Sequence, residues 1–144
     1  MLIPMKIDYS IRLVTYLANQ PAGKLTKSQE ISKAKHIPLQ YLLQISNSLI
    51  KGSMISGQRG PNGGYALLKK PENITVADIV KSLDHSVAPV ACIEFPDGCK
   101  FSGNCSQQEM WLTIEKMILN ELSKVKISSL IDDQVYVPMS DLVR

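Results

Sequence analysis

Apolar residues up to Gly52 recur at intervals of three and four, which predicts three consecutive amphipathic helices. The first ends at the breaker Asn-Gln-Pro-Ala-Gly of residues 19–23. The second is expected to begin after Thr26, because Thr26 and Gln29 have the spacing of a capping box. The third should begin with Pro38 at its first position and end near Gly52. The residues expected on its inner side are Leu39, Leu42, Leu43, Leu49 and Ile50.

A β-hairpin is predicted directly after the third helix. Residues 54–59 and 65–68 have the character of strands, and the turn Gly-Pro-Asn-Gly-Gly of residues 60–64 separates them. A winged helix-turn-helix domain has this order of elements: two short helices, a turn, a third helix and then a hairpin. We therefore expect a mainly α fold with a small β-hairpin.

The second half of the chain predicts a dimerisation helix after a loop. A capped helix should follow Asn73, residues 86–106 have little periodicity, and a long helix is expected from about Ser106 to Lys126. Apolar positions on this last helix cover more than one stripe, which suggests burial against a second chain. We expect a winged helix-turn-helix DNA-binding domain (1–84), a cysteine-bearing loop (85–106), a dimerisation helix (107–131) and a C-terminal tail (132–144).

Composition restricts the class of protein further. The 144 residues are 44% hydrophobic and 20% charged, which suits one core with an appended dimerisation element. No stretch reaches the roughly 20 apolar residues of a membrane span. The N-terminal residues do not resemble a signal peptide, so a cytoplasmic protein with free or metal-bound cysteines is expected.

Charge is unevenly distributed along the chain. Residues 24–70 contain eight basic residues and the single acid Glu30, a net charge of +7, whereas the remainder has a net charge of −4. A basic segment joined to an acidic remainder is typical of a module that binds a polyanion. Double-stranded DNA is the partner that fits the predicted fold.

The third helix is the candidate for reading bases. Its side opposite the leucines carries Gln40, Gln44, Asn47 and Lys51, and such amides can contact adenine. Arg59, next to Gly60 at the hairpin tip, can enter a minor groove. Symmetric contact with both strands favours a homodimer on an inverted repeat. Tyr41 could either pack under the turn or bind a phosphate, and the full DNA-contacting set is Thr26, Lys27, Ser28, Lys33, Pro38, Gln40, Tyr41, Gln44, Asn47, Lys51, Arg59 and Gly60.

All three cysteines lie within fourteen residues, as Cys92, Cys99 and Cys105 in a C-x6-C-x5-C pattern. Thiolates in one glycine-rich loop suit zinc or an iron–sulfur cluster. The pattern lacks the CxxC pairs of structural zinc sites, and no nearby histidine supplies a fourth ligand.

The chain resembles the IscR/NsrR/CymR family of bacterial repressors over residues 5 to about 131. The motifs that carry the resemblance are Asp8-Tyr9, Pro38-Leu-Gln-Tyr-Leu, the wing Arg59-Gly-Pro-Asn-Gly-Gly-Tyr and the three-cysteine loop. The resemblance implies a homodimeric transcription regulator whose operator affinity is switched by an iron–sulfur cluster that senses iron, redox state or nitric oxide.

The resemblance also implies ligands for a cluster, either 2Fe–2S or 4Fe–4S. Cys92, Cys99 and Cys105 are the expected cysteine ligands. Gln108 stands where the cluster-biogenesis branch has a histidine, and Asp8 stands near the acid of the nitric-oxide-sensing branch. Both are candidates for the fourth ligand.

Two other functions fit the same residues. One is a cluster-free repressor of this fold that uses thiol or zinc chemistry, and the other is an iron–sulfur carrier whose basic half docks on an acidic partner. An enzyme with a small-molecule substrate is not expected, because no nucleophile–base pair is evident and only His36 and His85 are histidines.

Overall fold

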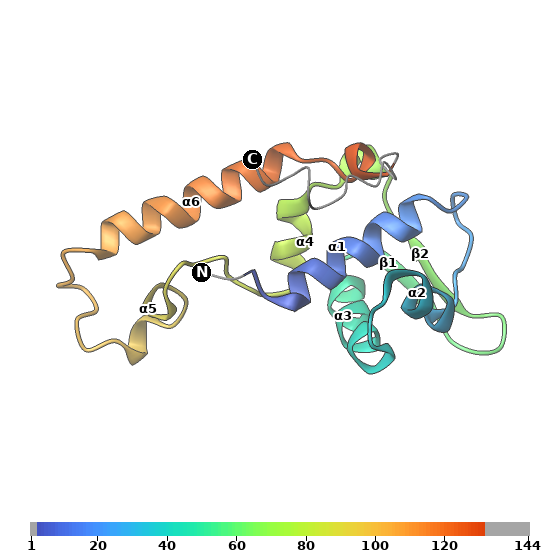
Figure 1. Ribbon diagram of the computed structural model, residues 1–144, viewed down its shortest axis with the longest axis horizontal. Coiled ribbons are helices and arrows are strands. Elements are labelled where there is room, and N and C mark those ends of the chain that lie inside the picture. The colour runs from blue at the N-terminus through green and yellow to red at the C-terminus, as the bar shows by residue number, and fades with distance from the viewer. Residues whose placement is uncertain (1–2, 132–144) are drawn as a thin grey trace, which may run out of the picture.

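The computed structural model describes residues 3–131, and within them the chain is mainly helical with one antiparallel hairpin (Figure 1). The predicted fold class is therefore confirmed. The elements are α1 (Met5–Ala18), α2 (Ser28–Lys35), α3 (Leu39–Lys51), β1 (Ile55–Gln58), β2 (Gly64–Leu67), η1 (Pro71–Asn73), α4 (Val76–Ser82), α5 (Ala91–Glu94), η2 (Pro96–Gly98), α6 (Gln108–Lys124) and η3 (Ile127–Leu130).

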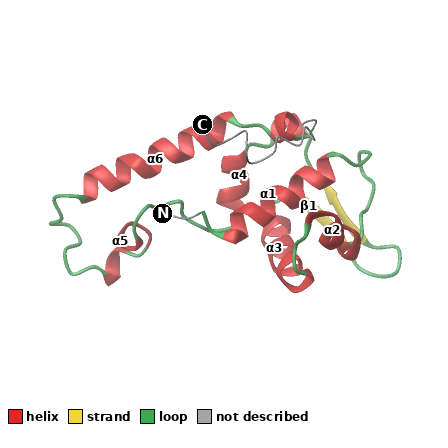
Figure 2. Cartoon of the chain, in the orientation of Figure 1, coloured by secondary structure: helices red, strands yellow, loops and turns green. Residues whose placement is uncertain are grey.

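Helices α1 to α4 and the hairpin form a body around one hydrophobic core, and α6 extends away from that body with α5 near its first turn (Figure 2). Within residues 3–131 no helix is long and apolar enough to cross a lipid bilayer. The largest fully buried side chains come from all four helices and from β1, and they include Leu13, Ile31, Leu42, Ile45, Leu49, Ile55 and Ile79.

The inner side of α3 differs from the prediction. Leu39, Leu43 and Ile50 are 36%, 40% and 37% exposed, so they do not belong to the core. A helix buries a row of residues three and four apart, and the row that faces α1 passes through Ile45. Pro38 is the N-cap rather than the first helical residue, because its ψ of 128° is not helical. The buried residues of α3 are Leu42, Ile45, Ser46 and Leu49.

The capping box predicted at the start of α2 is wrong. The N-cap is Lys27, and no side chain caps the helix. Thr26 is instead 1% exposed and pairs with Tyr65 through two backbone hydrogen bonds of 2.9 Å. A long-range strand-like contact has overridden a local capping pattern.

The predicted helix after Asn73 does carry a capping box. The Asp78 amide donates to Thr75 Oγ1 at 3.2 Å, and the Thr75 amide donates to Asp78 Oδ2 at 2.9 Å. Burial raises the pKa of the Asp78 carboxyl, but the hydrogen bonds from Thr75 and the charges of Lys81 and Lys69 outweigh it and hold that pKa below its ordinary value.

The chain returns to the body after α6. The helix ends at Lys124, Lys126 then forms a β-bridge with Thr75, and Ile127 is fully buried against the core. Val125 and Ile127 therefore pack against the core, and residues 125–131 do not extend the helix that was predicted over 107–131. The loop expected over residues 86–106 contains the short turns α5 and η2, and the predicted tail 132–144 lies outside the described residues.

Candidate nucleic-acid interface and cysteine cavity

A groove of about 620 Å³ lies between the start of α2, the side of α3 and the hairpin. Five residues of the predicted DNA-contacting set line it together: Lys27, Ser28, Asn47, Arg59 and Gly60. The groove also contains Gln29, Gln58 and Tyr65, which the sequence reasoning missed. Gln58 is the last residue of β1, and its place at the base of the predicted hairpin tip, next to Arg59, was the signal that could have identified it.

The hairpin that borders the groove requires its glycines. Strand β1 pairs with β2 in the register Ile55↔Leu67 to Gln58↔Gly64, so the tip runs from Arg59 to Gly63. A Cβ on Gly63 would overlap the Gln58 carbonyl oxygen, and Gly60 has a φ of +103° that favours glycine. Arg59 is consequently held on a narrow and exposed tip.

The exposed side of α3 carries the other predicted base-reading residues. Gln40, Gln44, Asn47 and Lys51 are all exposed, and Pro38 is exposed at the start of the helix. Lys33 is exposed on α2. The arrangement presents amides and a lysine on one side of a helix, which suits hydrogen bonding to base edges or phosphates.

Two residues of the predicted set have other roles in the structure. Thr26 is buried, so its side chain is not available to a phosphate, and the prediction for this residue is wrong. The partly buried ring of Tyr41 packs edge-on against Tyr9, with ring centroids 5.4 Å apart. Of the two alternatives for Tyr41, this contact favours packing.

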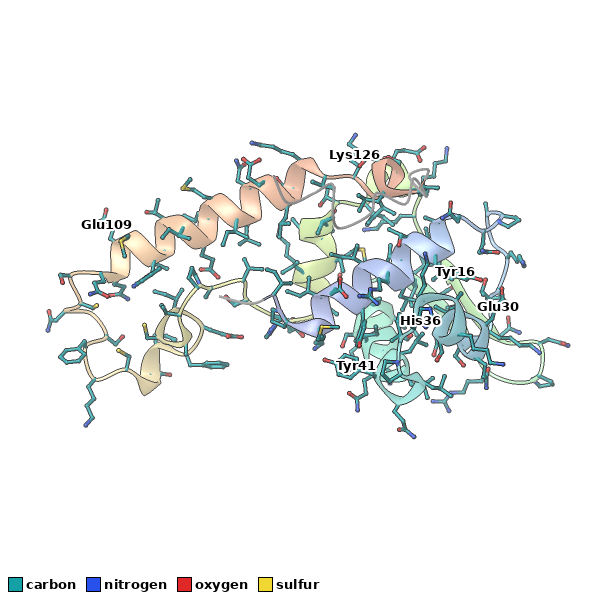
Figure 3. The ribbon with its side chains drawn as sticks, viewed as in Figure 1. Tyr16, Glu30, His36, Tyr41, Glu109 and Lys126 are labelled. Carbon is teal, nitrogen blue, oxygen red and sulfur yellow. The ribbon has the colours of Figure 1, made fainter. Side chains whose placement is uncertain are left out.

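The single acid of the basic segment is engaged by a tyrosine. The Tyr16 hydroxyl donates to Glu30 Oε1 at 3.0 Å, and both residues lie beside the start of α2 (Figure 3). Burial, followed by the hydrogen bond and the charge of Glu30, raises the pKa of Tyr16. Tyr16 thus stays protonated and able to donate to the one carboxylate within residues 24–70.

The three cysteines line one cavity of about 170 Å³ between α5 and the first turns of α6. Each is partly buried with a free thiol. The remaining lining residues include Gln108 and Trp111, together with the apolar Val90 and Ile93. Within residues 3–131 no three His, Cys, Asp or Glu side chains converge on a point that would hold a single metal ion. Three thiols around one partly apolar cavity fit the donor chemistry of an iron–sulfur cluster, whose ligands bind different iron atoms.

The two candidates for a fourth ligand lie in different places. Gln108 lines the cavity with the cysteines. Asp8 is absent from the cavity lining and lies in the first turn of α1, where Oδ2 is 2.7 Å from the Arg12 guanidinium. Within one chain, therefore, the structure brings Gln108 to the cysteines and leaves Asp8 apart from them.

Residues 3–133 match the Rrf2 family, described as "Iron-dependent Transcriptional regulator". The chain is 32% identical over 105 residues to the HTH-type transcriptional regulator IscR of Photorhabdus laumondii, which covers 73% of this chain and 63% of that protein. It is 29% identical over 123 residues to IscR of Citrobacter koseri, which covers 85% of this chain and 74% of that protein. These relatives are transcriptional regulators and not enzymes.

Solved structures share the fold. The structure of T. potens IscR superposes with a TM-score of 0.73 at 21% identity, over 98% of this chain and 96% of that one. CymR, the global cysteine regulator of B. subtilis, gives 0.70 at 23% identity, over 91% and 96% of the two chains.

Proposed function

The chain belongs to the Rrf2 family of transcriptional regulators, and we propose that it is a homodimeric DNA-binding repressor controlled by an iron–sulfur cluster. The observation that carries the DNA-binding part is the groove that gathers Lys27, Asn47 and Arg59 from three separate elements. Its basic residues belong to a segment of net charge +7, and affinity for DNA depends largely on such charge.

Replacing Arg59 by alanine is expected to weaken operator binding about ten- to hundredfold and to lower the steepness of the salt dependence. The variant would lose the attraction between the Arg59 guanidinium and the negative potential of the DNA minor groove, while its hairpin stays intact. The measurement is a titration of duplexes selected by the protein from a random library, at several salt concentrations. Lys81→Ala, an exposed lysine of α4 that removes the same charge, is the matched control. Equal binding by Arg59→Ala and Lys81→Ala would contradict the role of the wing.

The homodimer is supported by the exposure of α6. None of its seventeen residues is buried, although Ile118, Leu119 and Leu122 pack against the core. A second stripe remains uncovered on another side of the helix, at Met110, Ile114 and Met117, where the two methionines are 49% and 63% exposed. A second copy of the chain would bury this stripe.

The cysteine cavity supports control by a cluster. Cys92, Cys99 and Cys105 would hold the cluster as thiolates, and Trp111 would help to exclude water from it. A bound cluster would supply a centre that responds to iron, redox state or nitric oxide. Gln108 and Asp8 stay candidates for the fourth ligand.

Contacts of the cysteine-bearing segment provide a route to the DNA-binding body. Glu94 Oε1 on α5 lies 3.4 Å from His85 Nδ1, just after α4. The Ser86 hydroxyl donates to Glu115 Oε1 of α6 at 2.6 Å. A change in α5 would therefore act on residues 85 and 86, which follow α4 and of which Ser86 contacts α6, and such coupling is typically about 5- to 150-fold in affinity.

The experiment for this part uses protein purified without oxygen, with its visible absorption, iron, sulfide and zinc content measured. Wild type is expected to be coloured, with iron and sulfide in equal amounts, and Cys99→Ala is expected to lose both. Ser102→Ala, at another residue of the cavity lining, is the control and should keep the colour. A colourless protein that contains zinc or no metal would refute the cluster and leave the DNA-binding part standing.

A cluster-free thiol sensor is the second candidate. It is favoured by the similarity to CymR, which is named a cysteine regulator, and by the three free thiols in one cavity. The same purification separates the two functions, since only the cluster protein contains sulfide that acid releases.

A further inference from the structure

Two leucines on the exposed side of α3 lie outside the hydrophobic core. Leu39 and Leu43 are 36% and 40% exposed, and the core is filled by a different row of the helix. The third exposed residue, Ile50, lines the groove and lies under the hairpin, where a Cβ on Gly57 would come within 2.8 Å of its Cδ1. Ile50 thus has a structural partner in the wing, and the two leucines need another explanation.

The leucines share their side of the helix with amides. Leu39, Leu43 and Asn47 are spaced four residues apart and form one row along α3. The adjacent row contains Gln40 and Gln44, which are also exposed. Apolar and amide side chains therefore alternate across one surface that contains no acid.

We propose that Leu43, assisted by Leu39, contacts the C5-methyl groups of thymines in the major groove, so that α3 selects A·T base pairs. Thymine presents a methyl group there, and the adenine paired with it presents the N6 and N7 atoms that Asn and Gln recognise. One surface of leucines and amides is thus matched to both edges of the same base pair. This inference rests on the proposed DNA-binding function and names the bases it would read.

Charge argues for DNA over a second copy of the chain as the occupant of this surface. The leucines lie within residues 24–70, a segment of net charge +7. Two such surfaces facing each other would repel, whereas a duplex of phosphates would attract the same surface.

The test compares thymine with deoxyuridine, which keeps every hydrogen-bonding atom of the base and lacks only the methyl group. Duplexes selected by the full-length protein from a random library are resynthesised with dU at one A·T pair at a time. Wild type is expected to lose about fourfold in affinity at each contacted position, the equivalent of one buried methyl group. Leu43→Ala should bind the dT duplex more weakly and should no longer respond to dU at the positions that Leu43 contacts. Leu130→Ala, a leucine of η3 that is also 40% exposed, should behave as wild type.

Three results would overturn the inference, and a different one would refute the proposed function. Equal binding of dT and dU duplexes by wild type would overturn it, as would an undiminished response to dU in Leu43→Ala. A change of oligomeric state in folded Leu43→Ala, measured by sedimentation, would assign the surface to a second copy. Failure of the wild type to bind any duplex, even at low salt, would instead remove the DNA-binding function.

Discussion

Gly63→Ala is expected to reduce operator affinity at least about a hundredfold, or roughly 2.7 kcal/mol, while the helical body stays folded. A Cβ at this position would overlap the carbonyl oxygen of Gln58, which is backbone and cannot move without opening the hairpin. The hairpin positions Arg59 at the edge of the groove together with other lining residues. A distorted hairpin would therefore weaken binding more than the loss of the Arg59 side chain alone.

The measurement for Gly63→Ala is duplex titration with far-ultraviolet circular dichroism on the same samples. Asn62→Ala is the matched control, because Asn62 is exposed at the same tip and its replacement adds no atoms to the hairpin. A helical spectrum equal to wild type, together with weak binding, is the expected result. Binding as tight as that of Asn62→Ala would show that the wing does not contribute.

Met117→Glu is expected to convert the proposed dimer to a monomer and to weaken operator binding by about a hundredfold or more. Met117 is the most exposed member of the α6 stripe, at 63%, and a carboxylate there would be buried in the interface without a partner. A monomer reads one half-site and loses the effective concentration that links the two halves, which is worth about 10²–10⁴.

Sedimentation over a range of protein concentrations measures the first effect of Met117→Glu, and duplex titration measures the second. Lys116→Gln is the matched control, since it makes the same change in charge at the adjacent exposed position on another side of α6. A dimeric Met117→Glu protein would mean that the stripe serves another purpose.

The order of the elements was predictable because it depends on local patterns. Periodicity located α1 to α4 and α6 within a few residues, and the glycine-rich turn at residues 60–64 identified the hairpin. The gathering of the three cysteines was predicted from their concentration in fourteen residues of one glycine-rich loop.

The structure differs from the prediction where tertiary contacts select one of several arrangements that the local sequence allows. Helix α3 has more apolar residues than one stripe needs, and contact with α1 selected the row through Ile45 and left Leu43 outside. Thr26 has a favourable capping pattern, but its backbone pairs with Tyr65, thirty-nine positions away. Neither contact is visible in the local sequence.

In the candidate site, too, the sequence predicted positions that depend on local structure but not those that depend on tertiary packing. Gln108 shares the cavity with the cysteines because the first turn of α6 follows Cys105 directly. The proximity of Asp8 to Arg12 follows from their i,i+4 spacing in α1, but the separation of Asp8 from the cysteine cavity depends on how α1 packs against the rest of the body.

Because the chain returns to the body after α6, this helix is anchored at its C-terminal end and can act as a lever arm. Its far end is fixed where Lys126 pairs with Thr75 and Ile127 is buried, while its near end meets the cysteine cavity. Ile118 is the first residue of α6 that packs against the core, so the ten residues before it correspond to an arm of about 15 Å. By simple geometry, a displacement of about 2 Å at the cysteine end would rotate α6 by roughly 8° about this contact, and the chain just after the helix pairs with Thr75, the N-cap of α4.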